Sequence, residues 1–272
     1  MVIHQKKFLT LAEEDRILTI TINNPPENKL NNEIFLEFNT CRSLILSPDI
    51  DLIIFTGQGN IFSKGFDLNI IRTCPDPHVL REHLTFLNET YAFIESLHKP
   101  VIAAINGHCL GGGLELALVC HLRLCSEKAR LGLPELSMGI IPGLGGVHRL
   151  AKVVGQAKAF EMIAMGDVIS ASEALRINLV NRVLPKEKFM SGVLRIAKTL
   201  LMVDQGRLRE VIRLLRNCQV SGYARFNEQE NINAIIDSFV SICFAQEKNA
   251  PHPALSPQGR GENVWGHVKE RH

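Results

Sequence analysis

The sequence predicts an α/β fold built around a largely parallel sheet. Short apolar segments that read as strands, such as 52–55 and 101–105, alternate with longer segments whose apolar residues recur at helical spacing, and this alternation is typical of α/β proteins. The chain has 272 residues, of which 46% are hydrophobic and 21% charged, so it can bury a substantial core. No strand pattern remains between residues 187 and 246, which predicts a helical C-terminal region.

The first hundred residues contain two predicted strands, each followed by a helix. Residues 16–22 alternate between apolar and other side chains, as in a half-buried strand. Asn31 or Asn32 can cap the helix that follows, because a side-chain oxygen at that position accepts a bond from a free N–H of the first turn. Residues 52–55 form a continuously apolar strand, and residues 78–97 an amphipathic helix that ends before a Lys-Pro pair.

After the buried strand at 101–105, glycine-rich loops separate the predicted elements. Residues 106–113 read as a loop leading into a helix that starts near Leu114. The elements that follow are a strand at 121–125, a second glycine-rich loop at 142–146, a helix through Val154, a capping box from Ser170 to Glu173 that begins a short helix, and a last strand at 179–184.

We divide the chain into three regions on this basis. Residues 1–186 form the predicted α/β core and residues 187–250 the helical C-terminal region. Residues 251–272 contain several prolines and glycines with only scattered apolar residues, so we expect a disordered tail there.

Composition excludes several classes of function. Lys and Arg number 30 and Asp and Glu 28, which leaves a formal charge of +2, and this near balance lacks the basic character of a nucleic-acid-binding protein. The most apolar stretch, 101–120, is interrupted by polar residues and glycines, so no membrane association is expected. Seven cysteines without a C-x-x-C pair, and no secretion signal, predict reduced thiols in a cytoplasmic protein rather than disulfides or zinc.

A triple glycine and a nearby acid are the first candidate for chemistry. Gly111, Gly112 and Gly113 stand between an apolar strand and a helix, where they let the backbone approach a ligand and leave free N–H groups at the helix start. A tight turn or close packing explains glycines alone equally well. Glu115 favours a site, because it lies in an otherwise apolar helix, where it is either a partner of the helix dipole or a buried acid.

Two further segments add to this candidate. Glu135 stands in an apolar setting; it is either a solvated loop acid or a second carboxylate at the same site, in which case the pair would separate into a proton donor and an acceptor. Residues 63–68 follow the strand at 52–55, and Gly65 there can expose the N–H of Phe66. The alternative for this segment is an ordinary turn capped by Asp67.

Together these segments resemble the crotonase (enoyl-CoA hydratase/isomerase) superfamily. Residues 62–68 resemble its first oxyanion-hole loop, and residues 99–107 followed by 110–117 resemble its central signature. The motif continues in order over residues 133–150, and the resemblance extends from about residue 17 to 184.

The resemblance implies a crotonase-type ββα spiral core with a C-terminal helical trimerisation region, homotrimers or hexamers, and an acyl-CoA substrate. It assigns an oxyanion hole to the N–H groups of Phe66 and Gly112. Hydratases of the family carry a glutamate at the positions of both Glu115 and Glu135, so we expect water to add reversibly to a 2-enoyl-CoA. Glu135 would protonate Cα, and Glu115 would orient and activate the water, with no metal or redox cofactor.

The expected substrate-binding residues surround these groups. They are Lys29, Lys64, Gly65, Phe66, Asp67, Leu68, Gly111, Gly112, Pro134 and Gly143. The chain departs from the family in having Asn60 and Asn69 where many members carry lysines that contact CoA phosphates, so these contacts are expected from Lys29, Lys64 or Arg72. The usual C-terminal ending of the family is also not recognisable.

Alternative functions stay open on the same scaffold. They are double-bond isomerisation, decarboxylation and dehydration of a polyketide intermediate linked to an acyl-carrier protein. A catalytically silent acyl-CoA-binding protein is the alternative from a different class. RNA binding receives little support from a formal charge of +2.

Overall fold

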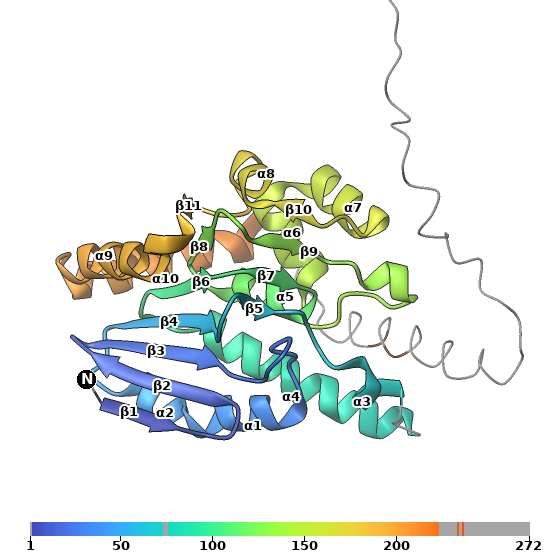
Figure 1. The fold of residues 1–272 in the computed structure, drawn as a ribbon, viewed down its shortest axis with the longest axis horizontal. Coiled ribbons are helices and arrows are strands. Elements are labelled where there is room, and N and C mark those ends of the chain that lie inside the picture. Colours follow the sequence, from blue (N-terminus) through green and yellow to red (C-terminus); the bar gives the residue numbers. More distant parts are fainter. Residues whose placement is uncertain (1, 73–75, 223–232, 234–235, 237–272) are drawn as a thin grey trace, which may run out of the picture.

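A computed structural model describes residues 2–72, 76–222, 233 and 236 of the chain (Figure 1). It contains one seven-stranded sheet and one four-stranded sheet, with helices packed against both. The predicted α/β class is confirmed, and the parallel character of the main sheet with it.

The seven-stranded sheet is antiparallel at its N-terminal edge and parallel from β3 onward. Its strands in spatial order are β1 (Val2–Gln5), β2 (Leu9–Glu14), β3 (Ile17–Ile22), β4 (Leu52–Gly57), β6 (Val101–Ile105), β8 (Leu122–Ser126) and β11 (Arg182–Leu184). The sequence predicts β3, β4, β6 and β8 within a few residues and β11 three residues too long at its start. It does not predict β1 and β2.

The four-stranded sheet is built from short strands. In spatial order they are β10 (Ile169–Ser170), β9 (Arg130–Gly132), β7 (His108–Leu110) and β5 (Ile61–Ser63). Because β7 lies within residues 106–113, the prediction of an uninterrupted loop there was wrong. Each of the pairs β4–β5, β6–β7 and β8–β9 places one strand in each sheet before the chain turns into a helix, which is the expected ββα repeat.

Helices fill the space around the two sheets (Figure 1). In chain order they are α1 (Asn32–Thr40), α2 (Arg42–Leu46), α3 (Leu68–Arg72), α4 (Pro77–Glu95), α5 (Gly112–Val119), the 3₁₀ turn η1 (Glu135–Met138), α6 (Gly146–Val154), α7 (Gln156–Met165), α8 (Ala171–Arg176), the 3₁₀ turn η2 (Lys186–Lys188), α9 (Phe189–Leu201) and α10 (Gln205–Gly222).

Two of these helices begin at the capping residues that the sequence predicts. The Asn31 side chain accepts a bond from the Ile34 N–H at the start of α1, and Ser170 accepts one from the Glu173 N–H at the start of α8. The single helix expected after Asn31 is two helices, α1 and α2, because the chain turns at Cys41.

Helix α5 is the centre of the molecule, since every one of its residues is buried. It contacts α4, α6 and strands of both sheets. An apolar all-round helix of this kind needs to be surrounded on all sides, and a glutamate inside it therefore lies in the interior. The four cysteines whose side chains the structure describes, Cys41, Cys109, Cys120 and Cys125, are buried free thiols.

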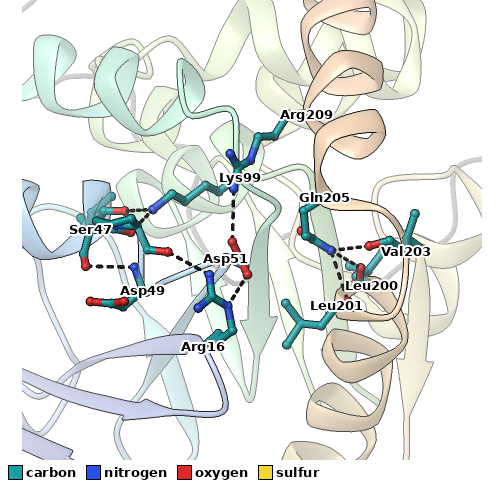
Figure 2. A network of polar contacts seen from close by, with 12 residues as sticks. Arg16, Ser47, Asp49, Asp51, Lys99, Leu200, Leu201, Val203, Gln205 and Arg209 are labelled. Atoms are coloured by element: carbon teal, nitrogen blue, oxygen red, sulfur yellow. Dashed lines mark hydrogen bonds and ion pairs between the residues drawn. The ribbon is translucent and has the colours of Figure 1, made fainter.

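The described part of the C-terminal region packs on the main sheet through α9, where Phe189 and Val193 join a cluster with Ile54 of β4. Figure 2 shows the polar contacts that continue this packing: Asp51 lies between Arg16 and Arg209 of α10. The remainder of the region up to residue 250, apart from residues 233 and 236, and the expected tail at 251–272 lie outside the described residues. Within residues 2–72 and 76–222, no helix is both long and apolar enough to cross a bilayer.

Candidate active site

A cavity of about 270 Å³ opens between α3, α4, the start of α5 and η1. Its wall includes all twelve residues that the resemblance leads us to expect in catalysis or substrate binding. These are Lys29, Lys64, Gly65, Phe66, Asp67, Leu68, Gly111, Gly112, Glu115, Pro134, Glu135 and Gly143. The rest of the wall is mainly apolar and consists of Asn69, Leu84, Leu87, Met138, Ile140, Ile141 and Leu144.

Among the described residues, the backbone N–H of Phe66 has no hydrogen-bond partner, because it points away from the segment with which Phe66 pairs. Leu30 and Phe66 form an isolated parallel bridge, in which the Leu30 N–H donates to the Gly65 carbonyl and the Asp67 N–H donates to the Leu30 carbonyl, both at 2.9 Å. A parallel bridge of this kind uses the peptide groups on either side of Phe66 and leaves its own N–H out of the ladder. That donor is at the cavity wall.

A second free donor is the N–H of Gly112, the first residue of α5. A residue in the first turn of a helix has no intrahelical acceptor for its N–H. Gly111 makes this start possible with φ 51° and ψ −129°, a conformation that favours glycine. A Cβ on Gly112 would lie 3.3 Å from the Phe66 nitrogen, so the two donors are neighbours.

Glu115 is buried in α5 with its carboxylate turned toward the 142–146 loop. Only 2% of the residue is exposed, and its Oε1 accepts bonds from the Leu144 N–H at 2.7 Å and the Gly146 N–H at 2.8 Å. Burial raises the pKa of Glu115, while these two N–H groups and the charge of Arg149 act in the opposite direction. The ionised form therefore has specific partners, although it is far from water.

Glu135 is the second buried acid, at the first position of η1. Its Oε2 is buried and has no hydrogen-bond partner among the residues that the structure describes. Burial raises the pKa of Glu135, and the charge of Glu115 raises it further. Because one acid has N–H partners and the other has an unpartnered oxygen, we expect the pair to hold one proton, on Glu135.

Two lysines lie at the cavity, and one acid joins them. Lys29 Nζ is 2.9 Å from Glu27 Oε2, and Lys64 Nζ is 2.8 Å from Glu27 Oε1. The bonds from Lys64 and Lys29 lower the pKa of Glu27 to about 2, so this carboxylate stays ionised at every pH near neutrality. The third candidate for phosphate contacts, the side chain of Arg72, lies outside the described part of the structure.

Several contacts that support this site were not predicted from the sequence, although Arg149 lies within the motif that the resemblance covers. Glu27 joins the two lysines, Arg149 donates to the Leu144 carbonyl at 2.6 Å, and Tyr91 donates to the Gly112 carbonyl at 2.8 Å. Gly145 was the one sequence feature that could have indicated the Arg149 contact, because a Cβ on Gly145 would lie 2.2 Å from the Arg149 Nη1. In the part of the chain that the structure describes, no group of three His, Cys, Asp or Glu residues could hold a metal ion.

Comparison with known proteins identifies the family. The family model described as "Enoyl-CoA hydratase/isomerase" matches residues 12–240. The chain belongs to the enoyl-CoA hydratase/isomerase family. The sequence resemblance to the crotonase superfamily is thereby confirmed, and it covers the cavity and both glutamates.

Individual members of the enoyl-CoA hydratase/isomerase family are similar over most of the chain. A "Probable enoyl-CoA hydratase" of Bacillus subtilis is 44% identical over 177 residues, which is 64% of this chain and 67% of the relative. A crotonyl-CoA hydratase of Syntrophomonas wolfei is 36% identical over 74% of this chain and 78% of its own. A crystal structure of an enoyl-CoA hydratase/isomerase from Xanthobacter autotrophicus superposes with a TM-score of 0.81 at 26% identity, covering 90% of this chain and 94% of the other.

Proposed function

We propose that the protein adds water reversibly to 2-enoyl-CoA thioesters to give 3-hydroxyacyl-CoA. The observation that carries this proposal is the meeting of two buried carboxylates, Glu115 and Glu135, with two free N–H groups at one cavity. The relatives named as hydratases support the same reaction. Hydration needs each of these groups, since it requires a base for water, an acid for Cα and a stabiliser for the enolate.

The two N–H groups of Phe66 and Gly112 act on the thioester oxygen. When water attacks Cβ, electrons move toward this oxygen and its negative charge grows. Fixed donors stabilise that charge more in the transition state than in the bound substrate, and this difference is what accelerates the reaction. The donors need no reorganisation because the fold already leaves both of them free.

The two glutamates divide the proton transfers. Glu115, ionised and held through Oε1 by two loop N–H groups, takes a proton from the water as its oxygen bonds to Cβ. Glu135, protonated because of its buried and unpartnered oxygen, gives its proton to Cα. Two carboxyl groups whose surroundings push their pKa values apart are suited to such paired acid and base roles.

The reaction as proposed needs no metal or redox cofactor, because water addition brings no net change in oxidation state and the chain supplies both acid and base. Coenzyme A belongs to the substrate. We assign its anionic groups to Lys29 and Lys64, which are the cationic residues at the cavity wall among those described. The apolar part of the wall, with Leu84, Leu87 and Ile140, is suited to an uncharged acyl chain. Homotrimer or hexamer formation stays a prediction.

The test is the loss of ultraviolet absorbance of the enoyl thioester over a series of acyl-chain lengths. We expect turnover by the wild-type protein and a kcat lowered by about 100-fold or more in Glu135→Gln, which removes the proton donor but keeps its shape. Near-normal hydration by this variant would contradict the assignment.

Double-bond isomerisation of a 3-enoyl-CoA is the second candidate, and one observation favours it. Glu115 holds the 142–146 loop through two N–H bonds, a structural task that would explain its presence without any role in catalysis, and isomerisation needs only one acid such as Glu135. The Glu115→Gln variant separates the two reactions, since isomerisation would survive it and hydration would not.

A further inference from the structure

Helix α4 carries three polar side chains on the side that it turns toward the site. Asn88, Tyr91 and Glu95 are separated by three and four positions, so they share one face of the helix. Asn88 is 3% exposed and Tyr91 0%. Glu95 lies nearer the surface, with 36% of its side chain exposed. For the two buried side chains, Asn88 and Tyr91, burial is costly unless the polar group makes hydrogen bonds.

Tyr91 reaches the start of α5. Its hydroxyl donates to the Gly112 carbonyl at 2.8 Å, and its ring packs against Phe35 with centroids 5.4 Å apart. Burial, followed by the charge of Glu115, raises the pKa of the Tyr91 phenol well above its usual value, so the hydroxyl stays a donor. The bond fixes the first turn of α5, and with it the residue whose N–H faces the thioester oxygen in the proposed reaction.

Asn88 and Glu95 reach the 142–146 loop. Asn88 Nδ2 donates to the Gly143 carbonyl at 3.1 Å. Glu95 Oε2 accepts from Arg149 Nε at 3.1 Å and Nη2 at 2.8 Å, and Arg149 Nη1 in turn donates to the Leu144 carbonyl. Two side chains of α4 thus hold successive peptide groups of one loop.

The Leu144 residue is held at both of its peptide groups. Its carbonyl accepts from Arg149, and its N–H donates to Glu115 Oε1 at 2.7 Å. Gly145, with φ 83°, leaves the space through which the guanidinium passes. The position of the Glu115 carboxylate is therefore set by a loop that α4 keeps in place.

We propose that Asn88, Tyr91 and Glu95 are positioning residues of the enzyme: Tyr91 aligns the Gly112 N–H, while Asn88 and Glu95 hold the loop that aligns Glu115. This inference rests on the proposed function and extends it, because side chains of one helix, α4, would hold both the oxyanion donor and the water-activating acid in place.

The test uses three variants and one matched control. Tyr91→Phe removes only a hydroxyl, Asn88→Leu keeps the size of the side chain, and Glu95→Gln removes the charge that anchors Arg149. Thr90→Val is the control: Thr90 is 1% exposed on the same helix, but its hydroxyl contacts Asn39 on the α1 side and the Phe86 carbonyl. Its loss therefore costs a buried hydrogen bond away from the cavity.

For Tyr91→Phe we expect kcat to fall about tenfold with KM within about twofold, since the lost bond serves the transition state. A bound unsaturated thioester chromophore should also lose part of its red shift, because this shift reports polarisation of its carbonyl by the two N–H groups. Thr90→Val should leave kcat, KM and the red shift unchanged.

For Asn88→Leu and Glu95→Gln we expect kcat to fall about five- to tenfold with the red shift retained. In Asn88→Leu the acid limb of the kcat/KM profile should move to higher pH, because the N–H groups that favour ionised Glu115 are less well held. The charged or titratable groups facing Glu115 are Arg149 from α6, Glu135 from η1 and Tyr91 from α4. This variant alters none of their charges.

The inference is overturned if all three variants match Thr90→Val in kcat, red shift and pH profile, since the side chains would then serve only the stability of the fold. Absence of hydration by the wild-type protein would instead overturn the proposed function. In that event two measurements that need no turnover still test the positioning role. An unchanged red shift of a bound chromophore in Tyr91→Phe, together with an unchanged NMR titration of the Glu115 carboxyl in Asn88→Leu, refutes it.

Discussion

Replacing Gly111 with alanine should impair stability and catalysis through two separate effects. The φ of 51° and ψ of −129° at Gly111 lie in a region that a residue with a Cβ enters only at a cost of about 1–3 kcal/mol. The new Cβ would also lie 2.9 Å from Glu135 Oε1, so the carboxyl must move by about 0.5 Å to reach an ordinary contact. Because a misplacement of about 1 Å costs about 100-fold in rate, we expect kcat to fall about tenfold.

A second glycine provides the control for this substitution. Gly59 also has a positive φ, 72°, but a Cβ there would meet no atom within 4 Å. We expect urea unfolding to show destabilisation of both variants, by about 1–3 kcal/mol. Only Gly111→Ala should lose activity in the absorbance assay with an enoyl thioester. The reasoning is refuted if the kcat values of the two variants agree within twofold.

Three further predictions concern the charged groups. Burial raises the pKa of Glu135 above its unfolded value near 4.5, so the folded state binds the Glu135 proton more tightly than the unfolded state does. The free energy of unfolding should therefore fall as the pH rises from about 4.5 through the raised pKa. Urea unfolding of Glu135→Gln at several pH values should show a shallower fall. Glu115→Ala leaves the N–H groups of Leu144 and Gly146 without their shared acceptor, Oε1, at about 1–3 kcal/mol each, whereas the amide oxygen in Glu115→Gln can still accept from both. Equal thermal stability of the two variants would argue against these bonds. Glu27→Gln removes the carboxylate that pairs with Lys29 and Lys64, and it should lower KM for a CoA thioester about threefold at low salt. KM for a pantetheine thioester, which lacks the phosphates, should not change. A raised KM for both substrates would contradict this prediction.

The main sheet was predictable because its inner strands are continuously apolar. β4 and β6 are buried at every position, and such runs bounded by glycine or proline stand out in a sequence. β5, β7 and β9 have three residues each, too few for any alternation to show. β1 is exposed at all four of its residues, so it leaves no hydrophobic pattern at all.

The candidate site was predictable where its groups form short local motifs, as the glycines before α5 and the two acids do. The contacts that tune it were not. Glu115 is bound by backbone N–H groups 29 and 31 positions away, and Tyr91 by a carbonyl 21 positions away. Any residue type offers such a backbone group, so the identity of the partner leaves no trace in the sequence. Only the fold determines which peptide groups meet these side chains.

The single rung of pairing between Leu30 and Phe66 has a consequence for how this wall of the cavity can vary. Phe66 pairs with Leu30 through the peptide groups on either side of it, so its own N–H points to the opposite side, where Phe66 lines the cavity. The proposed reactivity therefore depends on the open side of this segment and not on the length of its pairing with Leu30. An insertion that placed a further strand on that open side would give the donor a permanent acceptor, and the protein would become a poorer catalyst.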